Sequence, residues 1–315
     1  MSTTTALQAL RNSGICISSD TAEYHRQWPP SSSEPNLANF NSKKKEIERF
    51  KPELSDATTN PSLVLAAVYK QGYVDIVHDA VQFARLGLPS TSVKEITALA
   101  MDRLLVQVGV RISEIVPGRV SVSVDPALLM IARHDPQGEF LHLVALLEEL
   151  NIPRHRILIK IPATYAGIRA AQVLEHPSSG EPIHTNMTLI FGRVQAIACA
   201  QAGVSVISPF IGRVKDWWDA EGADASTPLS QHPGILLVQD IRSTYSALGT
   251  KTQIMAAGFR AVAEIVELGK YGVAGGPDIV TLPPHLLDGL WNMEIWKSHW
   301  RSNHVRLIQE PFQNI

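Results

Sequence analysis

Lys160 is the residue whose surroundings most clearly predict chemistry. It stands in the run RILIKIP, residues 156–162, between two isoleucines and shortly before Pro162. Lysine is rarely buried unless it is paired, and burial in a low dielectric lowers the pKa of its amine. A neutral amine is a nucleophile that can condense with a carbonyl substrate to form a Schiff base. The plainer alternative is a strand lysine that reaches solvent or pairs with an inward carboxylate.

Polar residues also close the neighbouring β-type runs. Asp20 ends one run and Asn60 ends the next, while Asn186 and Thr188 stand two residues apart and therefore on one face of a strand. Taken singly, each of these residues is also an ordinary helix N-cap that follows a strand. Taken together they converge where Lys160 points, which favours a site of carbonyl chemistry.

The elements that must position these side chains alternate along the chain. Stretches with helical periodicity, such as residues 61–72 and 91–116, separate eight short β-type runs, which lie at residues 14–20, 54–60, 119–125, 156–162, 182–188, 204–210, 252–258 and 278–284. This alternation is typical of βα units and a parallel sheet, which could close as a (β/α)8 barrel or stay open and doubly wound. Polar residues end nearly every run, whereas an open sheet would gather them at one switch point. We therefore predict an α/β fold of the (β/α)8 TIM-barrel type, with residues 1–315 as a single domain.

Two segments depart from this regular pattern. Residues 29–50 are rich in Pro, Ser and charged residues, and they indicate a polar surface insertion. A short C-terminal tail starts at about residue 291 and carries Trp291, Trp296 and Trp300. Because each Trp buries a large area, we expect these side chains to pack on the core, and the alternative is a subunit contact.

The overall composition excludes several functions. The formal net charge is −2, with 45% hydrophobic and 18% charged residues, so no basic field for nucleic acid is expected. No apolar run reaches the length that spans a bilayer, so no membrane role is expected. Cys16 and Cys199 are isolated thiols, and no signal peptide is recognisable. We expect a cytoplasmic protein.

Four segments together resemble the transaldolase family. They are DATTNPSLVLAA (56–67), ILIKIPATYAGIRAA (157–171), NMTLIFGRVQAIACAQAGVSVISPFIGRVKDWW (186–218) and IMAAGFRAVAEI (254–265). The resemblance extends from about residue 20 to about residue 290. It implies a (β/α)8 barrel that forms a lysine Schiff base with a ketose phosphate and transfers a dihydroxyacetone unit to an aldose phosphate. It also implies no metal and no organic cofactor, a place in the pentose phosphate pathway, and a homodimer as one possible assembly.

The resemblance carries over to the site residue by residue. Lys160 matches the Schiff-base lysine, Asp20 the acid and base at the cleaved bond, and Thr188 the threonine that works through a water. The expected substrate contacts are the hydroxyl-binding Asn60 and Asn186, the donor-unit contact Ser208, the apolar wall residue Phe210, and the phosphate-binding Arg213 and Arg260. The alternative is a turn or helix cap for the Asp, Asn and Thr residues, core packing for Phe210, and a surface ion pair for each arginine.

The chain departs from the family pattern in its third run, VSVSVDPAL. Ser123 stands where the family has a glutamate that works as an acid and base on the carbinolamine and imine, and Ala127 replaces an arginine. Gly258 stands where the family usually has serine. Loss of one general acid or base typically costs about 10²- to 10⁴-fold in rate. This leaves open a specialised Schiff-base carbon-carbon lyase or ligase with a different substrate, or a non-catalytic sugar-phosphate-binding barrel.

Overall fold

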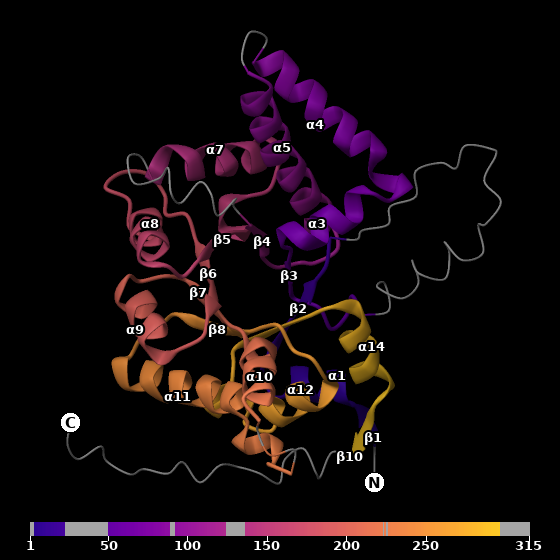
Figure 1. The fold of residues 1–315 in the computed structure, drawn as a ribbon, viewed down its shortest axis with the longest axis vertical. Coiled ribbons are helices and arrows are strands. Elements are labelled where there is room, and N and C mark those ends of the chain that lie inside the picture. Colours follow the sequence, from indigo (N-terminus) through magenta and orange to yellow (C-terminus); the bar gives the residue numbers. More distant parts are fainter. Residues whose placement is uncertain are drawn as a thin grey trace, which may run out of the picture.

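Eight parallel strands close into a barrel (Figure 1). The structure, a computed structural model, describes residues 3–22, 50–88, 92–123, 136–222, 224 and 226–296. The barrel strands, in their order around the barrel, are β2 (Cys16–Asp20), β3 (Asp56–Thr58), β4 (Val120–Ser123), β5 (Ile157–Pro162), β6 (Thr185–Ile190), β7 (Val206–Pro209), β8 (Gln253–Ala256) and β9 (Ile279–Leu282). All eight lie within or overlap the predicted runs. The predicted (β/α)8 barrel is therefore confirmed.

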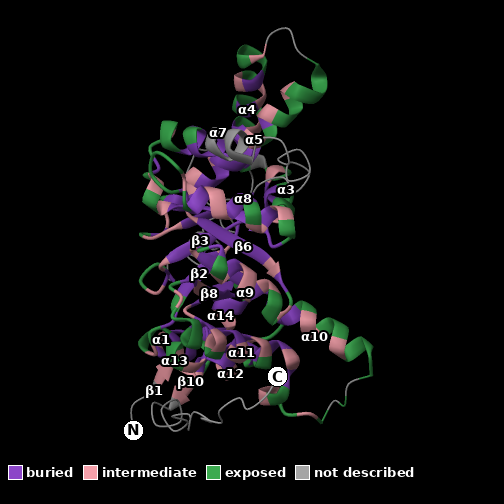
Figure 2. Ribbon diagram, turned by 90° about the vertical axis from the view of Figure 1, so that its left-hand side faces the viewer, coloured by how far each residue is buried: buried purple, intermediate pink, exposed green. Residues whose placement is uncertain are grey.

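Helices follow the strands and cover the outside of the barrel (Figure 1). They are α1 (Ala6–Asn12), α3 (Pro61–Val68), α4 (Val74–Gly87), α5 (Val93–Ser113), α7 (Pro136–Glu149), α8 (Tyr165–Glu175), α9 (Arg193–Gln201), α10 (Ile211–Ala220), α11 (Pro233–Leu248), α12 (Val262–Gly269), α13 (Gly272–Gly275) and α14 (Pro284–Asn292). The two helices predicted from periodicity appear as α3 and α5. Ser92 and Glu95 form a capping box at the start of α5, which fixes where this helix begins. Helices α4 and α5 project beyond the barrel at one end of the molecule (Figure 2).

A small second sheet joins the two ends of the described chain. β1 (Thr3–Thr5) pairs antiparallel with β10 (Glu294–Trp296), a pairing that the sequence patterns do not predict. Trp291 packs partly buried against the core and meets the ring of Phe50 edge-on, with ring centroids 5.7 Å apart. This agrees with the expected core packing of Trp291. The predicted insertion before Phe50, and the tail beyond Trp296 with Trp300, lie outside the described residues.

Apolar side chains form a floor inside the barrel. Leu158, Val206, Met255 and Ile279 make a buried cluster that is separate from the large core between strands and helices. Leu158 precedes Lys160 by two residues and so shares its face of the strand. The barrel interior is therefore apolar on the amino-terminal side of Lys160, and polar at the level of the lysine and toward the carboxyl ends of the strands. No described helix is long and apolar enough to cross a bilayer.

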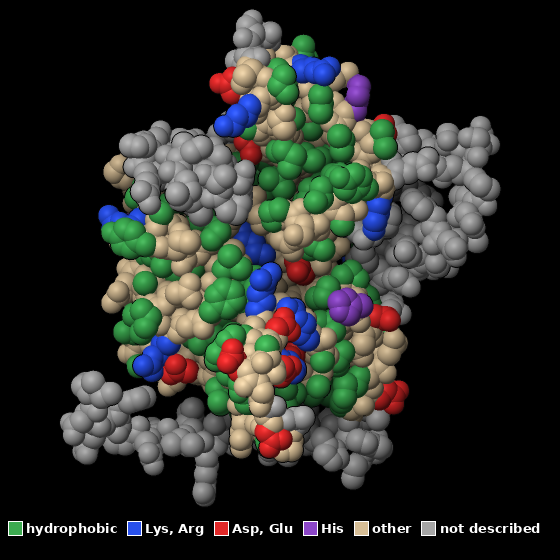
Figure 3. Space-filling model, in the orientation of Figure 1, with side chains coloured by type: hydrophobic (Ala, Val, Ile, Leu, Met, Phe, Trp, Pro, Cys, Tyr) green, Lys and Arg blue, Asp and Glu red, His purple; other side chains and the backbone are tan. Residues whose placement is uncertain are grey.

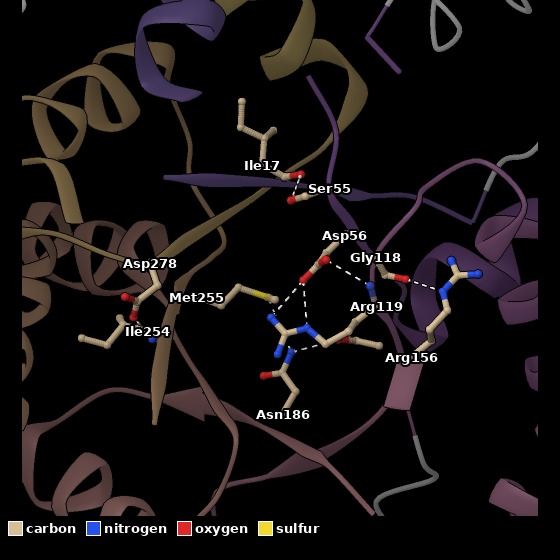
Figure 4. A network of polar contacts seen from close by, with 11 residues as sticks. Ile17, Ser55, Asp56, Gly118, Arg119, Arg156, Asn186, Ile254, Met255 and Asp278 are labelled. Atoms are coloured by element: carbon tan, nitrogen blue, oxygen red, sulfur yellow. Dashed lines mark hydrogen bonds and ion pairs between the residues drawn. The ribbon is translucent and has the colours of Figure 1, made fainter. Parts of the chain in front are cut away.

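Carboxylates bind strand amides at the amino end of the barrel (Figure 4). The Asp56 carboxylate accepts hydrogen bonds from the backbone N–H of Arg119 at 3.0 Å and from its guanidinium at 3.1 and 3.2 Å. Asp278 accepts from the backbone N–H of Ile254 at 2.7 Å and pairs with Arg242 at 2.6 Å. These contacts satisfy strand ends that have no further ladder partner.

Glu175 repeats this arrangement on the next strands. One carboxylate oxygen accepts from the backbone N–H groups of Thr185 and Ser205, both at 2.7 Å, and its other oxygen lies 3.2 Å from Nδ1 of His184. Burial raises the pKa of Glu175, but these hydrogen bonds outweigh it and hold the pKa below its ordinary value. The carboxylate therefore joins β6 to β7 at the end of the barrel away from Lys160.

Candidate active site

Lys160 lies in the interior of the barrel near the carboxyl end of β5. It pairs in register with Ser123 on β4 and with Asn186 on β6. Its side chain is buried, and Nζ donates to the carbonyl oxygen of Thr59 at 3.4 Å. Burial lowers the pKa of the amine, and the nearby charge of Asp20 opposes this effect only in part. The residue is neither a solvent-facing strand lysine nor a member of a close ion pair within the described part of the chain.

Asp20 ends β2 and is fixed by a short chain of hydroxyl groups. Thr58, its register partner on β3, donates from Oγ1 to the carboxylate at 2.9 Å. Thr281 on β9 has its Oγ1 2.6 Å from that of Thr58. Because a hydroxyl carries one proton, Thr281 must donate to Thr58 when Thr58 donates to Asp20. The two threonines thus hold the half-buried carboxylate over the barrel interior.

Asn186 is the centre of a second buried polar group. Its Oδ1 accepts from the hydroxyl of Ser208 at 2.7 Å, and its Nδ2 donates to the hydroxyl of Ser121 at 3.1 Å. Nδ2 also lies 3.5 Å from the sulfur of Met255 (Figure 4). The amide orientation is therefore fixed by contacts from three other strands. Asn186 and Ser208, which the sequence predicts as substrate contacts, meet directly.

Thr188 and Ser123 stand on either side of the lysine strand. Thr188 is buried, and its hydroxyl has no hydrogen-bond partner within the part of the chain that the structure describes. An unpaired buried hydroxyl is costly unless a water or ligand satisfies it. The hydroxyl of Ser123 donates to the carbonyl oxygen of Thr59 at 3.3 Å, the same oxygen that Lys160 approaches. The position at which we expect a departure from the family pattern therefore lies next to the lysine.

Asn60 has the capping role that the sequence left open. Its Oδ1 accepts from the backbone N–H of Leu63 at 3.0 Å, so the side chain is the N-cap of α3. Pro61 at the first helical position completes a common helix start. This contact uses the amide oxygen, while the amide nitrogen has no partner among the described residues. A cap and a ligand contact are thus compatible at this position.

Phe210 and two arginines follow the neighbouring strands. The ring of Phe210, just after β7, meets that of Phe191 edge-on, with centroids 5.9 Å apart. Arg213 is exposed in the first turn of α10, and Arg260 is exposed in the loop after β8. The backbone of Gly212, which precedes Arg213, lies close to Arg260, because a Cβ at this glycine would lie 2.9 Å from Cγ of Arg260. Basic and acidic side chains gather near the middle of the face shown in Figure 3.

Arg260 is held in one orientation. Asp216 on α10 accepts from its Nε at 3.1 Å and from Nη2 at 2.6 Å, and the carbonyl of Gly258 accepts from Nη1 at 2.9 Å. The guanidinium lowers the pKa of the Asp216 carboxyl. Gly258 has φ of 71°, a left-handed backbone that favours glycine. The sequence did not indicate Asp216 as part of this site.

Two other site residues that the sequence did not indicate stand two positions before predicted site residues. Thr58 precedes Asn60 by two residues, and Ser121 precedes Ser123 by two. The period-two rule places Ser121 and Ser123 on one face of β4, so this signal was available there, whereas Asn60 lies beyond β3 as the cap of α3. Thr59 was not accessible in this way, because it contributes its backbone carbonyl. Within the described residues, no group of three or more His, Cys, Asp or Glu side chains is placed to hold a metal ion.

Fold and site together define a (β/α)8 barrel with a buried lysine amine among hydroxyl, amide and carboxylate groups. The Transaldolase/Fructose-6-phosphate aldolase family matches residues 41–312 of this chain. The chain belongs to that family.

Several relatives named transaldolase share much of the sequence. The transaldolase of Thermosynechococcus vestitus is 43% identical over 248 residues, which cover 78% of this chain and 60% of the relative. The transaldolase of Gloeobacter violaceus is 44% identical over 248 residues, covering 78% and 59%. The transaldolase of Schizosaccharomyces pombe is 39% identical over 287 residues, covering 91% and 78%. The chain thus spans about 60% of the length of the two bacterial relatives.

Proposed function

We propose that this protein is a transferase that moves a dihydroxyacetone unit from a ketose phosphate to an aldose phosphate through a Schiff base on Lys160. The observation that carries the proposal is the burial of the Lys160 amine, which lowers its pKa, inside a polar barrel. Membership of the transaldolase family and the names of the relatives support the same reaction.

In the proposed reaction the neutral Lys160 amine adds to the ketone carbon, and loss of water leaves a protonated imine. Asp20 then takes the proton of the hydroxyl beside the bond to be cleaved. The C3–C4 bond breaks, its electron pair enters the imine to form an enamine, and the aldose phosphate leaves. The enamine next attacks the carbonyl carbon of the acceptor aldehyde, and water releases the new ketose and regenerates the amine. The hydroxyl chain from Thr281 through Thr58 supports this role, because it aims the Asp20 carboxylate.

The remaining polar residues supply binding and proton transfer in this proposal. Asn60 and Asn186 hold substrate hydroxyls, and Ser208 contacts the donor unit. Thr188 binds the water that exchanges protons with the imine, which its unpaired buried hydroxyl supports. Phe210 shields the enamine from bulk water. Arg213 and Arg260 bind the phosphate, because a planar guanidinium suits its oxygens in bidentate fashion.

Ser123 makes a second function worth testing. Its hydroxyl cannot replace the family carboxylate near neutral pH without a base beside it. Asp125, which could compensate, lies outside the described residues. A slow transferase and a Schiff-base carbon-carbon lyase or ligase with another substrate are both compatible with this change. We favour the transferase because both arginines of the phosphate site are retained. A cytoplasmic setting and a homodimer are further parts of the proposal.

The transfer reaction itself tests the proposed function. Purified protein is incubated with fructose 6-phosphate and erythrose 4-phosphate, and the seven-carbon ketose phosphate is followed by mass spectrometry. We expect product from the natural chain and none from Lys160→Met, which keeps the length and apolar stem of the side chain. Lys160-dependent conversion of unphosphorylated ketones alone would favour the lyase or ligase. Ligand-induced thermal stabilisation without any Lys160-dependent turnover would favour the non-catalytic barrel.

A further inference from the structure

The carboxyl end of β6 contains an irregularity next to the proposed reacting groups. Thr188 pairs in register with Ser208 and Ile190 with Pro209, so Leu189 is an extra residue in the strand. Leu189 has φ of 63°, in the left-handed region that residues other than glycine seldom adopt. Such bulges often lie beside active sites, where they redirect a side chain.

The bulge turns backbone groups out of the strand ladder. The carbonyl of Thr188 accepts from the backbone N–H of Ala163 at 2.8 Å, and that of Ile190 accepts from Phe210 at 3.0 Å. The carbonyl of Leu189, between them, and the N–H of Phe191, which follows, bond instead to a side chain. Leu189 is half-buried and Phe191 is exposed, and this side chain holds their two backbone groups in one arrangement.

Gln195 on α9 is the side chain that satisfies both groups. Its Oε1 accepts from the N–H of Phe191 at 2.9 Å, and its Nε2 donates to the carbonyl of Leu189 at 3.2 Å. Nε2 also donates to the carbonyl of Ala163 at 3.1 Å, three residues after Lys160. A primary amide provides two N–H donors and a carbonyl acceptor, so each donor and the acceptor has a partner.

We propose that Gln195 is a positioning residue that fixes the end of β6 against the end of β5, and so holds the Thr188 hydroxyl and the Phe191–Phe210 wall beside an imine on Lys160. The chemical part of this inference rests on the proposed function. Gln195 acts through backbone groups and through the bulge, because its three hydrogen bonds all go to main-chain atoms. Its loss should loosen the wall that keeps water from the enamine.

Water at the enamine has a definite consequence. The enamine carbon takes a proton, water hydrolyses the resulting imine, and free dihydroxyacetone leaves as the lysine amine is regenerated. This release competes with transfer to the acceptor. Removal of Gln195 should therefore change the ratio of transfer to release, whereas a general loss of folded protein would lower both rates equally.

The test compares Gln195→Leu, which removes the amide at similar size, with Gln195→Glu, which keeps the acceptor but turns a carboxylate toward two carbonyl oxygens. Gln201→Leu, an exposed position on the same helix, is the matched control. We expect faster amide hydrogen exchange over residues 186–192 in both Gln195 variants, with exchange unchanged over residues 279–282 of β9, which does not pair with β6. We expect kcat for transfer to fall roughly 10- to 100-fold, KM to change little, and the released fraction of dihydroxyacetone to rise. The control should match the natural chain.

Two results would overturn the inference. If both Gln195 variants exchange residues 186–192 at the same rate as the natural chain, the Gln195 side-chain amide does not fix the segment. If exchange is faster but the ratio of transfer to release equals that of the natural chain, the segment does not position the groups beside the imine. If the natural chain forms no Schiff base with fructose 6-phosphate, the proposed function fails and takes the chemical part of the inference with it. The exchange comparison still decides, in that case, whether Gln195 holds the two strand ends together.

Discussion

Ser123 and Lys160 are register partners on neighbouring strands, and both donate to one carbonyl oxygen, at 3.3 and 3.4 Å. That oxygen belongs to Thr59, which directly follows β3. A side chain longer than serine at position 123 would therefore reach the Lys160 amine. The resemblance implies a family glutamate at this position, which lies beside the Lys160 amine.

Restoring this carboxylate should speed the reaction. In Ser123→Glu, a general acid and base returns beside the amine, and we expect kcat for transfer to rise by about 10²-fold or more. Ser123→Gln is the matched control, because it has the same length without the titrating group, and it should show no gain. Steady-state transfer assays measure both variants. A gain in the glutamine variant alone, or in neither, would contradict a role for the absent carboxylate.

The charge of Asp20 should be visible in the pH dependence of Schiff-base formation. Only the neutral amine of Lys160 adds to a ketone, so the rate falls as pH drops through the pKa of this residue. Asp20 raises that pKa against the lowering by burial. In Asp20→Asn the pKa falls further, and the acid limb of the trapping rate moves to lower pH. Thr58→Val removes a hydrogen bond but no charge and should leave the limb in place. If the acid limb of Asp20→Asn lies at the same or a higher pH than that of the natural chain, the charge of Asp20 does not raise the pKa of Lys160.

Arg260 should matter only for phosphorylated substrates. Hydrogen bonds to charged groups contribute about 1.5–3 kcal/mol, so Arg260→Ala should raise KM for fructose 6-phosphate roughly 10- to 100-fold. KM for unphosphorylated fructose should change little. Arg154→Ala is a suitable control, because Arg154 pairs with Glu148 ahead of β5, at the opposite end of the barrel. Equal changes for both substrates would indicate a structural role for Arg260.

Glu175 should make the fold sensitive to acid. Its pKa is lowered in the folded protein, so its contribution to the free energy of unfolding is present above its unfolded pKa of about 4.3 and is lost as pH falls through the folded pKa. We expect Glu175→Gln to lower the free energy of unfolding by about 1–3 kcal/mol at neutral pH. Below about pH 4 the variant should lose less additional stability than the natural chain does. Denaturant unfolding at several pH values measures this. Glu221→Gln, at an exposed position, is the control and should show the same pH dependence of stability as the natural chain. The same pH dependence in Glu175→Gln would show that the Glu175 carboxylate contributes nothing.

Much of the barrel and part of the site could be predicted from local patterns. The strands of a closed parallel barrel are short runs that end in polar residues. The sequence around Asp20, Lys160 and Asn186 therefore indicates both the strands and the end of the barrel at which these side chains meet. Sequence also predicts that Asn60 and Thr188 point toward that end. The capping contact of Asn60 was one of the two readings that the sequence allowed.

Features that depend on distant partners could not be predicted in this way. A surface ion pair was the alternative that the sequence left open for Arg260, but its partner Asp216 lies 44 positions away, and the pairing depends on how α10 packs beside the loop after β8. The left-handed backbone of Leu189 has no signature in the sequence, because leucine does not favour it. The pairing of β1 with β10 likewise depends on where the barrel brings the two ends of the described chain.

Trapping of the imine tests the central claim most directly. The protein is incubated with fructose 6-phosphate, reduced with borohydride, digested, and sequenced by tandem mass spectrometry. We predict a reduced sugar-phosphate adduct on Lys160, absent from Lys160→Met, in a variant whose melting temperature shows that it remains folded. Absence of an adduct on Lys160 with ketose phosphates, or an adduct on another lysine that persists in Lys160→Met, would contradict the claim that this buried amine is the nucleophile.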